Sequence, residues 1–201
     1  MNKSADIAIV GAGIAGLAHA YAALKKGYKV VLFEREQFAV GASVRNFGLL
    51  WPIGQQPGEG FERAMKSRSL WKTIASESGI WLNENGSLHC AYHDDEWEVL
   101  QEFIEIYRNA GYECELHSSA EVSKKSNAIK PKNLKGALWS KTECTVNPRE
   151  AVRKIPLWLE EKYGLILRFG HVVKGIALPK VYSSREVWDV NHVIICNGAD
   201  F

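Results

Sequence analysis

Residues 6–34 read DIAIVGAGIAGLAHAYAALKKGYKVVLFE, and this stretch predicts a β-α-β unit. The apolar run at residues 7–10 is typical of a buried parallel strand. It is followed at once by GAGIAG at residues 11–16, which has the G-x-G-x-x-G spacing of a dinucleotide site. Apolar residues then recur at helical spacing up to Gly27, which is typical of a helix end. Residues 29–33 are predicted to form the second strand.

Each part of this motif has a structural role in binding a dinucleotide. Gly11 makes the tight turn, Gly13 lets the backbone approach a pyrophosphate, and Gly16 lets helix and strand pack closely. The helix N-terminus, at Ile14 and Ala15, offers unpaired N–H groups and a positive dipole end to the phosphates. Glu34 follows the second strand, where a carboxylate accepts hydrogen bonds from a ribose diol. We therefore expect this stretch to bind an adenine dinucleotide.

Composition excludes several other classes of function. The chain has 201 residues, 46% of them apolar and 24% charged, which is typical of a soluble globular protein. A net charge of +2 favours neither nucleic acid nor an anionic membrane, and no apolar run approaches the roughly 20 residues of a membrane helix. The four cysteines form no C-x-x-C pair, so we expect reduced thiols in a cytoplasmic protein. We also expect no metal site, because His89 and Cys90 are neighbours in a predicted strand and point to opposite faces.

The loop at residues 41–48, GASVRNFG, is the first indication of which dinucleotide is bound. A nicotinamide-binding domain usually continues into a crossover helix and a third parallel strand at this point. Here small residues alternate with Ser, Arg and Asn, which suits a loop that wraps an extended ligand. On these residues alone, an ordinary polar surface loop is an equally good interpretation.

Further along, the pattern predicts helices at residues 59–78, 94–109 and 147–163, with Pro156 kinking or dividing the last of them. Asn85-Gly86 is a strong turn signal and predicts a hairpin between strands at residues 81–83 and 87–92. Strands are also predicted at residues 136–140, 165–169, 172–178, 187–190 and 192–196. The last of these ends in Asn197-Gly198-Ala199, a small-residue turn at the kind of strand end where ligands gather in open parallel sheets.

The motifs and their order along the chain resemble those of the FAD-dependent amine oxidoreductases of the D-amino-acid oxidase, glycine oxidase and sarcosine oxidase superfamily. Gly41-Ala42-Ser43 matches the loop after the ribose-binding acid, and Val173 matches the valine that contacts adenine. Residues 193–199, VIICNGA, match the strand and turn at the pyrophosphate. Residues 44–54, 136–140 and 146–150 resemble a subgroup associated with phosphonate catabolism.

The resemblance implies an α/β fold. A Rossmann-like FAD-binding domain of residues 1–50 and 145–201 would carry an inserted α+β substrate domain of residues 51–144. Family members continue beyond the position of Phe201, so the chain is expected to be the N-terminal portion of such an enzyme.

The resemblance also implies the site. FAD is expected to bind non-covalently, because residues 41–48 contain no His or Cys. Trp51 is a candidate on the substrate side, and no catalytic base is nominated. The expected cofactor-binding residues are Gly11, Gly13, Ile14, Ala15, Gly16, Glu34, Arg35, Ala42, Ser43, Arg45, Asn46, Phe47, Gly48, Val173, Asn197 and Gly198.

The activity implied is oxidation of a small primary or secondary amine, of amino acid or aminophosphonate type. Hydride transfer to flavin N5 would give an imine that hydrolyses, with oxygen or another acceptor reoxidising the flavin. Two alternatives stay open. One is a non-catalytic N-terminal fragment of such an enzyme, and the other is a nicotinamide-dependent reductase or flavin hydroxylase that uses the same glycine loop.

Overall fold

The computed structural model describes residues 3–107 and 109–199, so Phe201 lies outside the described residues. The chain forms two compact units. The first comprises Met1–Phe47, Ile74–Trp81 and Asn147–Phe201, and the second comprises Gly48–Thr73 and Leu82–Val146. The helix α2 (Glu59–Ser78) begins in the second unit, and its last residues belong to the first.

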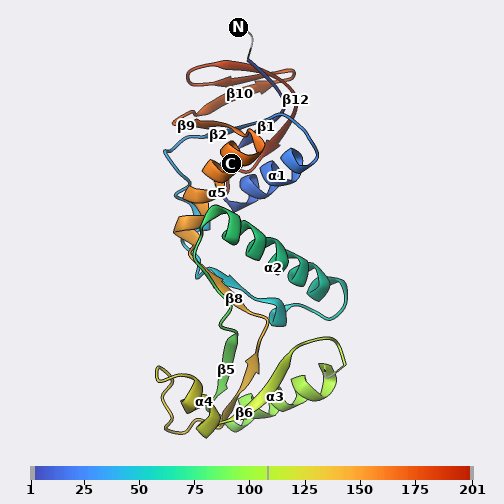
Figure 1. Cartoon of the computed structure of the whole chain (residues 1–201), viewed down its shortest axis with the longest axis vertical. Helices are drawn as coiled ribbons and strands as arrows, with labels where there is room; N and C mark the ends of the chain where they lie inside the picture. Colours follow the sequence, from blue (N-terminus) through green and yellow to red (C-terminus); the bar gives the residue numbers. More distant parts are fainter. Residues whose placement is uncertain (1–2, 108, 200–201) are drawn as a thin grey trace. The chain divides into compact units, whose positions relative to one another are not determined.

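A six-stranded sheet forms the first unit, with the strand order β10-β11-β12-β1-β2-β9 (Figure 1). Strands β12, β1, β2 and β9 are parallel neighbours, and the β10–β11 hairpin adds antiparallel strands beside β12. The carboxyl ends of the parallel strands therefore meet at one edge of the sheet. The elements of this unit are β1 (Lys3–Val10), α1 (Ile14–Lys25), β2 (Val30–Glu34), η1 (Ala42–Val44), α5 (Pro148–Tyr163), β9 (Ile166–Phe169), β10 (Val173–Ala177), β11 (Lys180–Ser183) and β12 (Val187–Ile195).

Alternation along β1 sends side chains to two different layers. Ile9 is fully buried and faces α1, since its Cγ2 atom lies 3.4 Å from a Cβ built on Gly16. The helices α1 and α5 pack together through an aromatic contact between Tyr21 and Trp158, whose ring centroids are 5.4 Å apart. Ala8 belongs instead to the core cluster on the opposite face. In that cluster, Phe33 of β2 meets Trp188 of β12 edge to face, with ring centroids 6.2 Å apart.

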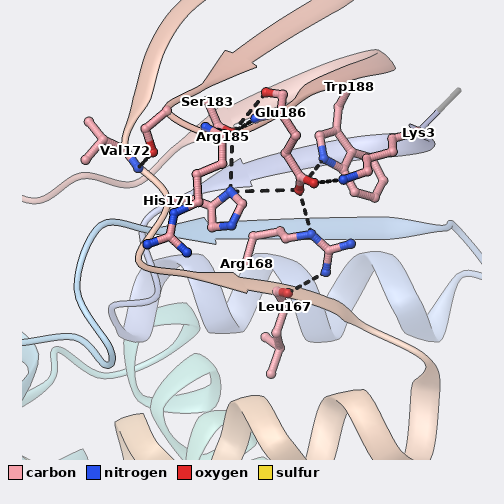
Figure 2. Close-up of polar contacts among 10 residues, drawn as sticks. Lys3, Leu167, Arg168, His171, Val172, Ser183, Arg185, Glu186 and Trp188 are labelled. Atoms are coloured by element: carbon pink, nitrogen blue, oxygen red, sulfur yellow. Dashed lines mark hydrogen bonds and ion pairs between the residues drawn. The ribbon is translucent and has the colours of Figure 1, made fainter.

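The turn between β11 and β12 carries a nearly buried carboxylate, Glu186, that ties several strands together (Figure 2). Its Oε1 atom accepts hydrogen bonds from Arg168 Nε at 2.6 Å and from Trp188 Nε1 at 2.8 Å. Its Oε2 atom pairs with Lys3 at the start of β1. His171 Nδ1 lies 3.8 Å from Oε1. The network joins β1, β9 and β12 and holds the chain segment that leads into β10.

The second unit contains two small antiparallel sheets, β5-β7-β6 and β3-β8-β4. Alternation along β7 assigns its two faces to different helices. Leu138 belongs to a cluster with residues of α3, such as Leu100, while Ala137 belongs to a cluster with Val122 of α4. The elements are β3 (Leu49–Leu50), η2 (Pro52–Gly54), β4 (Leu82–Asn83), β5 (Ser87–Ala91), α3 (Asp94–Tyr107), β6 (Cys114–Ser118), α4 (Ser119–Lys125), β7 (Gly136–Ser140) and β8 (Cys144–Val146).

Three details differ from the expectations. The hairpin predicted at Asn85-Gly86 is wrong, because β4 pairs with β8 and β5 pairs with β7, so the turn connects two sheets. Pro156 does not divide α5, which is continuous over Pro148–Tyr163. The two strands predicted at residues 187–190 and 192–196 form the single strand β12, which reaches both β11 and β1.

The inserted domain expected at residues 51–144 also differs in detail from the compact units. Residues 74–81 fall in that range but belong to the first unit. Among the described residues, no helix is both long and apolar enough to cross a membrane.

Candidate functional site

Close approach of the backbone makes glycine necessary at two positions of the glycine loop. Gly11 has φ +103°, and a Cβ atom there would lie 2.4 Å from the carbonyl oxygen of Cys196. A Cβ atom on Gly16 would lie 2.0 Å from the carbonyl oxygen of Gly11. The first glycine therefore fits the loop beside the end of β12, and the second brings α1 against the loop. Gly13 is less crowded, because a Cβ atom there would lie 3.1 Å from Ser43 Oγ.

The N-terminus of α1 presents backbone donors. Ser43 Oγ accepts a hydrogen bond from the Ile14 N–H at 2.9 Å, so η1 is joined directly to the start of the helix. Gly13 is the N-cap residue and makes no side-chain cap bond. Within the described residues, the N–H groups of Gly13 and Ala15 have no hydrogen-bond acceptor. Free N–H groups, the helix dipole and a nearby hydroxyl are the donor set that a pyrophosphate needs.

Glu34, at the end of β2, is 9% exposed and serves the same loop. Its Oε2 atom accepts a hydrogen bond from the Ala12 N–H at 2.9 Å, and Oε1 accepts one from the Glu36 N–H at 3.1 Å. Each carboxylate oxygen has a further lone pair, so the side chain can hold the glycine loop and still accept from a diol.

Two later segments come to the same edge of the sheet. The His171 N–H donates to the Glu34 carbonyl at 2.9 Å, which places the approach to Val173 beside the end of β2. The Cys196 N–H donates to the Val10 carbonyl at 2.7 Å, and the Asn197 Cα atom lies 3.4 Å from the position that a Cβ atom on Gly11 would take. His171 and Asn197 therefore lie at the edge that carries the glycine loop, and the Val173 side chain, two residues further on, packs against the core cluster that contains Phe33.

Apart from Gly198, which follows Asn197, the remaining predicted residues lie in η1 and the loop on either side of it, or in the second unit. Ala42 and Ser43 lie in η1, where the Ser43 carbonyl accepts from Asn46 Nδ2 at 3.0 Å. Arg45 is exposed and Phe47 is 90% exposed.

Arg35 is exposed as well and has Glu36 within 4.0 Å. Gly48 and Trp51 belong to the second unit, where the Gly48 carbonyl accepts from the Val146 N–H at 2.8 Å.

Cys196 is a neighbour of the loop that belongs to the matched segment 193–199 but is not among the residues expected to bind the cofactor. Its carbonyl oxygen faces Gly11, and its thiol lies 4.0 Å from His19 Nδ1. Burial raises the pKa of the thiol, so the group stays uncharged beside the anion-binding loop. The role of its backbone could not be found from residue type, because any side chain can follow that strand.

Comparison with known proteins agrees with this geometry. The sequence profile of the family described as FAD dependent oxidoreductase, DAO, matches residues 6–201. A glycerol 3-phosphate dehydrogenase of Caloramator mitchellensis is 24% identical, covering 96% of this chain and 42% of that protein. A glycine oxidase of Geobacillus kaustophilus is 25% identical, covering 69% of this chain and 39% of that protein.

Among solved structures, L-proline dehydrogenase from P. horikoshii superposes with a TM-score of 0.83 at 25% identity. The match covers 99% of this chain and 54% of that one. The chain thus spans about two fifths of the length of the curated relatives and about half of the solved one. The profile match over residues 6–201 and the shared fold show that the chain belongs to the DAO family of FAD-dependent oxidoreductases, whose cofactor is FAD.

Proposed function

We propose that the protein, as part of a complete family enzyme, oxidises a small amine of amino acid or aminophosphonate type. The observation that carries the proposal is the joining of the glycine loop, Glu34 and Ser43 at one sheet edge, together with the match to the family. When bound, FAD supplies the hydride acceptor for the carbon next to the amine nitrogen. The substrate type is supported by the relatives named glycine oxidase and L-proline dehydrogenase.

In this proposal the chain's own residues hold the cofactor without a covalent bond. The N–H groups of Gly13 and Ala15 and the Ser43 hydroxyl bind the pyrophosphate. Glu34 accepts from the ribose, and Val173 lies against the adenine. These roles are consistent with the free donors at the start of α1 and with the burial of Glu34. The other expected cofactor-binding residues are proposed to line the same cofactor: Gly11, Ile14, Gly16, Arg35, Ala42, Arg45, Asn46, Phe47, Gly48, Asn197 and Gly198.

The domain assignment is part of the same proposal. The first compact unit, which contains the glycine loop and the parallel sheet, would be the FAD-binding domain. The second unit, which contains Trp51 and the two antiparallel sheets, would supply part of the substrate domain.

A second candidate is oxidation of a phosphorylated polyol. One observation favours it: the relative named glycerol 3-phosphate dehydrogenase matches 96% of this chain, a larger share than the glycine oxidase does. The two candidates differ in the heteroatom bonded to the carbon that loses hydride, which is nitrogen in one case and oxygen in the other.

Anaerobic flavin reduction separates the candidates. Full-length protein is loaded with FAD and mixed without oxygen with glycine, L-proline, 2-aminoethylphosphonate or glycerol 3-phosphate. Loss of the oxidised-flavin absorbance with an amine, and none with glycerol 3-phosphate, is the expected result. Bleaching by glycerol 3-phosphate alone would establish the second candidate. Failure of the full-length protein to bind FAD would overturn both.

A further inference from the structure

A cavity of about 350 Å³ lies wholly within the second unit, and its wall is mostly apolar. Trp51, Leu100, Phe103 and Leu138 are among the lining residues. His89 also lines the cavity, because it alternates with Cys90 along β5 and shares the face of its β7 partner, Leu138. The Trp51 ring stacks on the His89 ring with centroids 6.3 Å apart. In a mostly apolar cavity, a single polar group such as this imidazole can orient a ligand and select for it by hydrogen bonding.

Behind His89 lies a fully buried carboxylate. Glu143 is 0% exposed, and its Oε1 atom accepts from the Ile53 N–H at 3.0 Å and from Thr142 Oγ1 at 2.9 Å. Its Oε2 atom accepts from Ser87 Oγ at 3.1 Å, and Ser87 Oγ lies 2.9 Å from His89 Nε2. No Lys, Arg or His in the described part of the chain forms an ion pair with Glu143. The carboxylate is held by neutral donors, and one of them touches the cavity histidine.

The hydrogen-bond network decides the tautomer of His89. A hydroxyl has one hydrogen, and Ser87 donates it to Glu143. The contact between Ser87 and His89 therefore requires Nε2 to carry the proton and to donate it to Ser87 Oγ. Burial lowers the pKa of His89, with the Glu143 charge opposing the shift, so the ring is neutral at pH 7. Nδ1 is then an acceptor, and it has no hydrogen-bond partner among the described residues.

We propose that this cavity binds a small ligand that has a flat apolar body and presents an N–H or O–H donor to His89 Nδ1. Trp51 and the α3 side chains contact the body, while Ser87, held by Glu143, acts as a positioning residue that fixes the ring proton on Nε2 and so leaves Nδ1 as the acceptor. The binding of such a ligand does not rest on the proposed function.

Indole and benzofuran are a matched pair of probes, since they have the same bicyclic shape and differ in one ring N–H. Each is titrated into full-length protein and followed by ligand-observed NMR. We expect indole to bind about tenfold more tightly than benzofuran, which is the effect of one hydrogen bond to an acceptor in an apolar wall. His89→Phe keeps a flat ring and removes both nitrogens, and it should reduce the ratio to about one. Equal binding of the two probes to the wild-type protein, or binding of neither, would overturn the proposal.

Two further variants control for folding and for binding elsewhere. Val99 lines the cavity and is 61% exposed on α3, so Val99→Trp should fill the space and abolish binding of both probes without disturbing the core. His192→Phe changes an exposed histidine of β12 and should keep the tenfold ratio. A ratio that persists in His89→Phe would contradict the role of Nδ1.

The tautomer of the His89 ring can be measured directly. Nitrogen-15 shifts of the His89 ring should show an unprotonated Nδ1 in the wild-type protein and a mixture of tautomers in Ser87→Ala. A wild-type ring protonated at Nδ1 would overturn the proposed acceptor. Flavin absorbance is recorded on the same samples, so that loss of FAD, which concerns the proposed function, is distinguished from loss of the cavity ligand.

Discussion

At the scale of single residues, Gly16 shows a conflict between local preference and tertiary contact. It lies inside α1, where alanine is preferred over glycine by about 1 kcal/mol. A Cβ atom there would lie 2.0 Å from the Gly11 carbonyl oxygen, a distance that forces backbone to move. The steric contact outweighs the propensity because the Gly11 backbone is held at the end of β1 by its N–H bond to the Phe33 carbonyl at 2.7 Å, and the Gly16 backbone is held within α1.

Gly16→Ala is therefore expected to lower the free energy of unfolding by about 1–3 kcal/mol, the usual cost of overpacking. Gly60→Ala is the matched control, since Gly60 lies in α2 and a Cβ atom there would approach no atom closer than 4.0 Å. It should raise the free energy of unfolding by up to about 1 kcal/mol. Urea unfolding followed by circular dichroism measures both, and a gain in stability for Gly16→Ala would contradict the steric argument.

Ser43 tests the link between η1 and the helix start. Ser43→Ala removes the acceptor of the Ile14 N–H and is expected to cost about 1 kcal/mol of stability, as loss of a cap does. If the hydroxyl also binds the pyrophosphate as proposed, FAD affinity should fall about tenfold. Titration of FAD into the apoprotein measures the affinity. Ser4→Ala, on an exposed serine of β1, is the control, and equal affinities of the two variants would contradict the proposed contact.

At the scale of elements, the Glu186 network fastens the β11–β12 turn to β1 and β9 (Figure 2). The Glu186 side chain is 9% exposed, while Arg168 and Lys3 are 30% and 44% exposed. A carboxylate this buried loses a large part of its hydration on folding, and three donors compensate for that loss. The strands that frame the Val173 segment thus depend on one side chain in a turn.

Glu186→Gln leaves Arg168 and Lys3 without a counter-charge and is expected to lower the free energy of unfolding by about 2 kcal/mol. This loss is smaller than that of a fully buried ion pair, because both cations are partly exposed to solvent. Asp189→Asn is the comparison, because Asp189 pairs with Lys180 at 2.8 Å between half-exposed side chains. That change should cost less than about 1 kcal/mol. Equal losses in the two variants, measured by urea unfolding, would show that burial of Glu186 is unimportant.

At the scale of the whole molecule, stability should depend on pH through His171. Burial lowers its pKa, and the nearby charges of Arg185, Arg168 and Lys3 add to the shift. The Glu186 carboxylate, 3.8 Å from Nδ1, acts against the shift. A histidine with a lowered folded-state pKa binds fewer protons in the folded than in the unfolded protein. The stabilisation is therefore complete above the ordinary value of 6.5 and is lost as pH falls below it towards the folded-state pKa.

The free energy of unfolding should accordingly decrease as the pH falls from about 7.5 to about 5. His171→Asn retains a donor for the Ser183 Oγ contact at 3.3 Å and removes the titration, so it should make the decrease shallower. Urea unfolding at several pH values measures the slope, with His192→Asn as a matched exposed control. A slope that is unchanged in His171→Asn would assign the pH dependence to other groups. His89, whose pKa burial also lowers, is the next candidate.

Local sequence determined the glycine-loop unit almost completely. Residues 6–34 specify a strand, a turn with positive φ at Gly11, a helix and a second strand, because most of the contacts that hold this unit, such as the Glu34 bond to the Ala12 N–H and the approach of Gly16 to Gly11, join residues of the same stretch. The start of α5 at Asn147-Pro148 and its end at Gly164, with φ +71°, follow from capping chemistry in the same way. The order of FAD motifs along the chain was sufficient to predict the family.

Pairing between distant strands was decided by tertiary structure. Asn85-Gly86 carries a hairpin signal, but the strands on either side of it each find a better partner, β8 and β7, far along the chain. The residues around the buried Glu143 in the sequence likewise do not indicate that its carboxylate is connected to His89 through Ser87. Turns and helix ends depend on the conformational energies of neighbouring residues, so a short stretch of sequence can predict them. The partner of a strand, and the contacts of a buried polar side chain, depend on which distant segments pack against each other. No local sequence pattern encodes that choice.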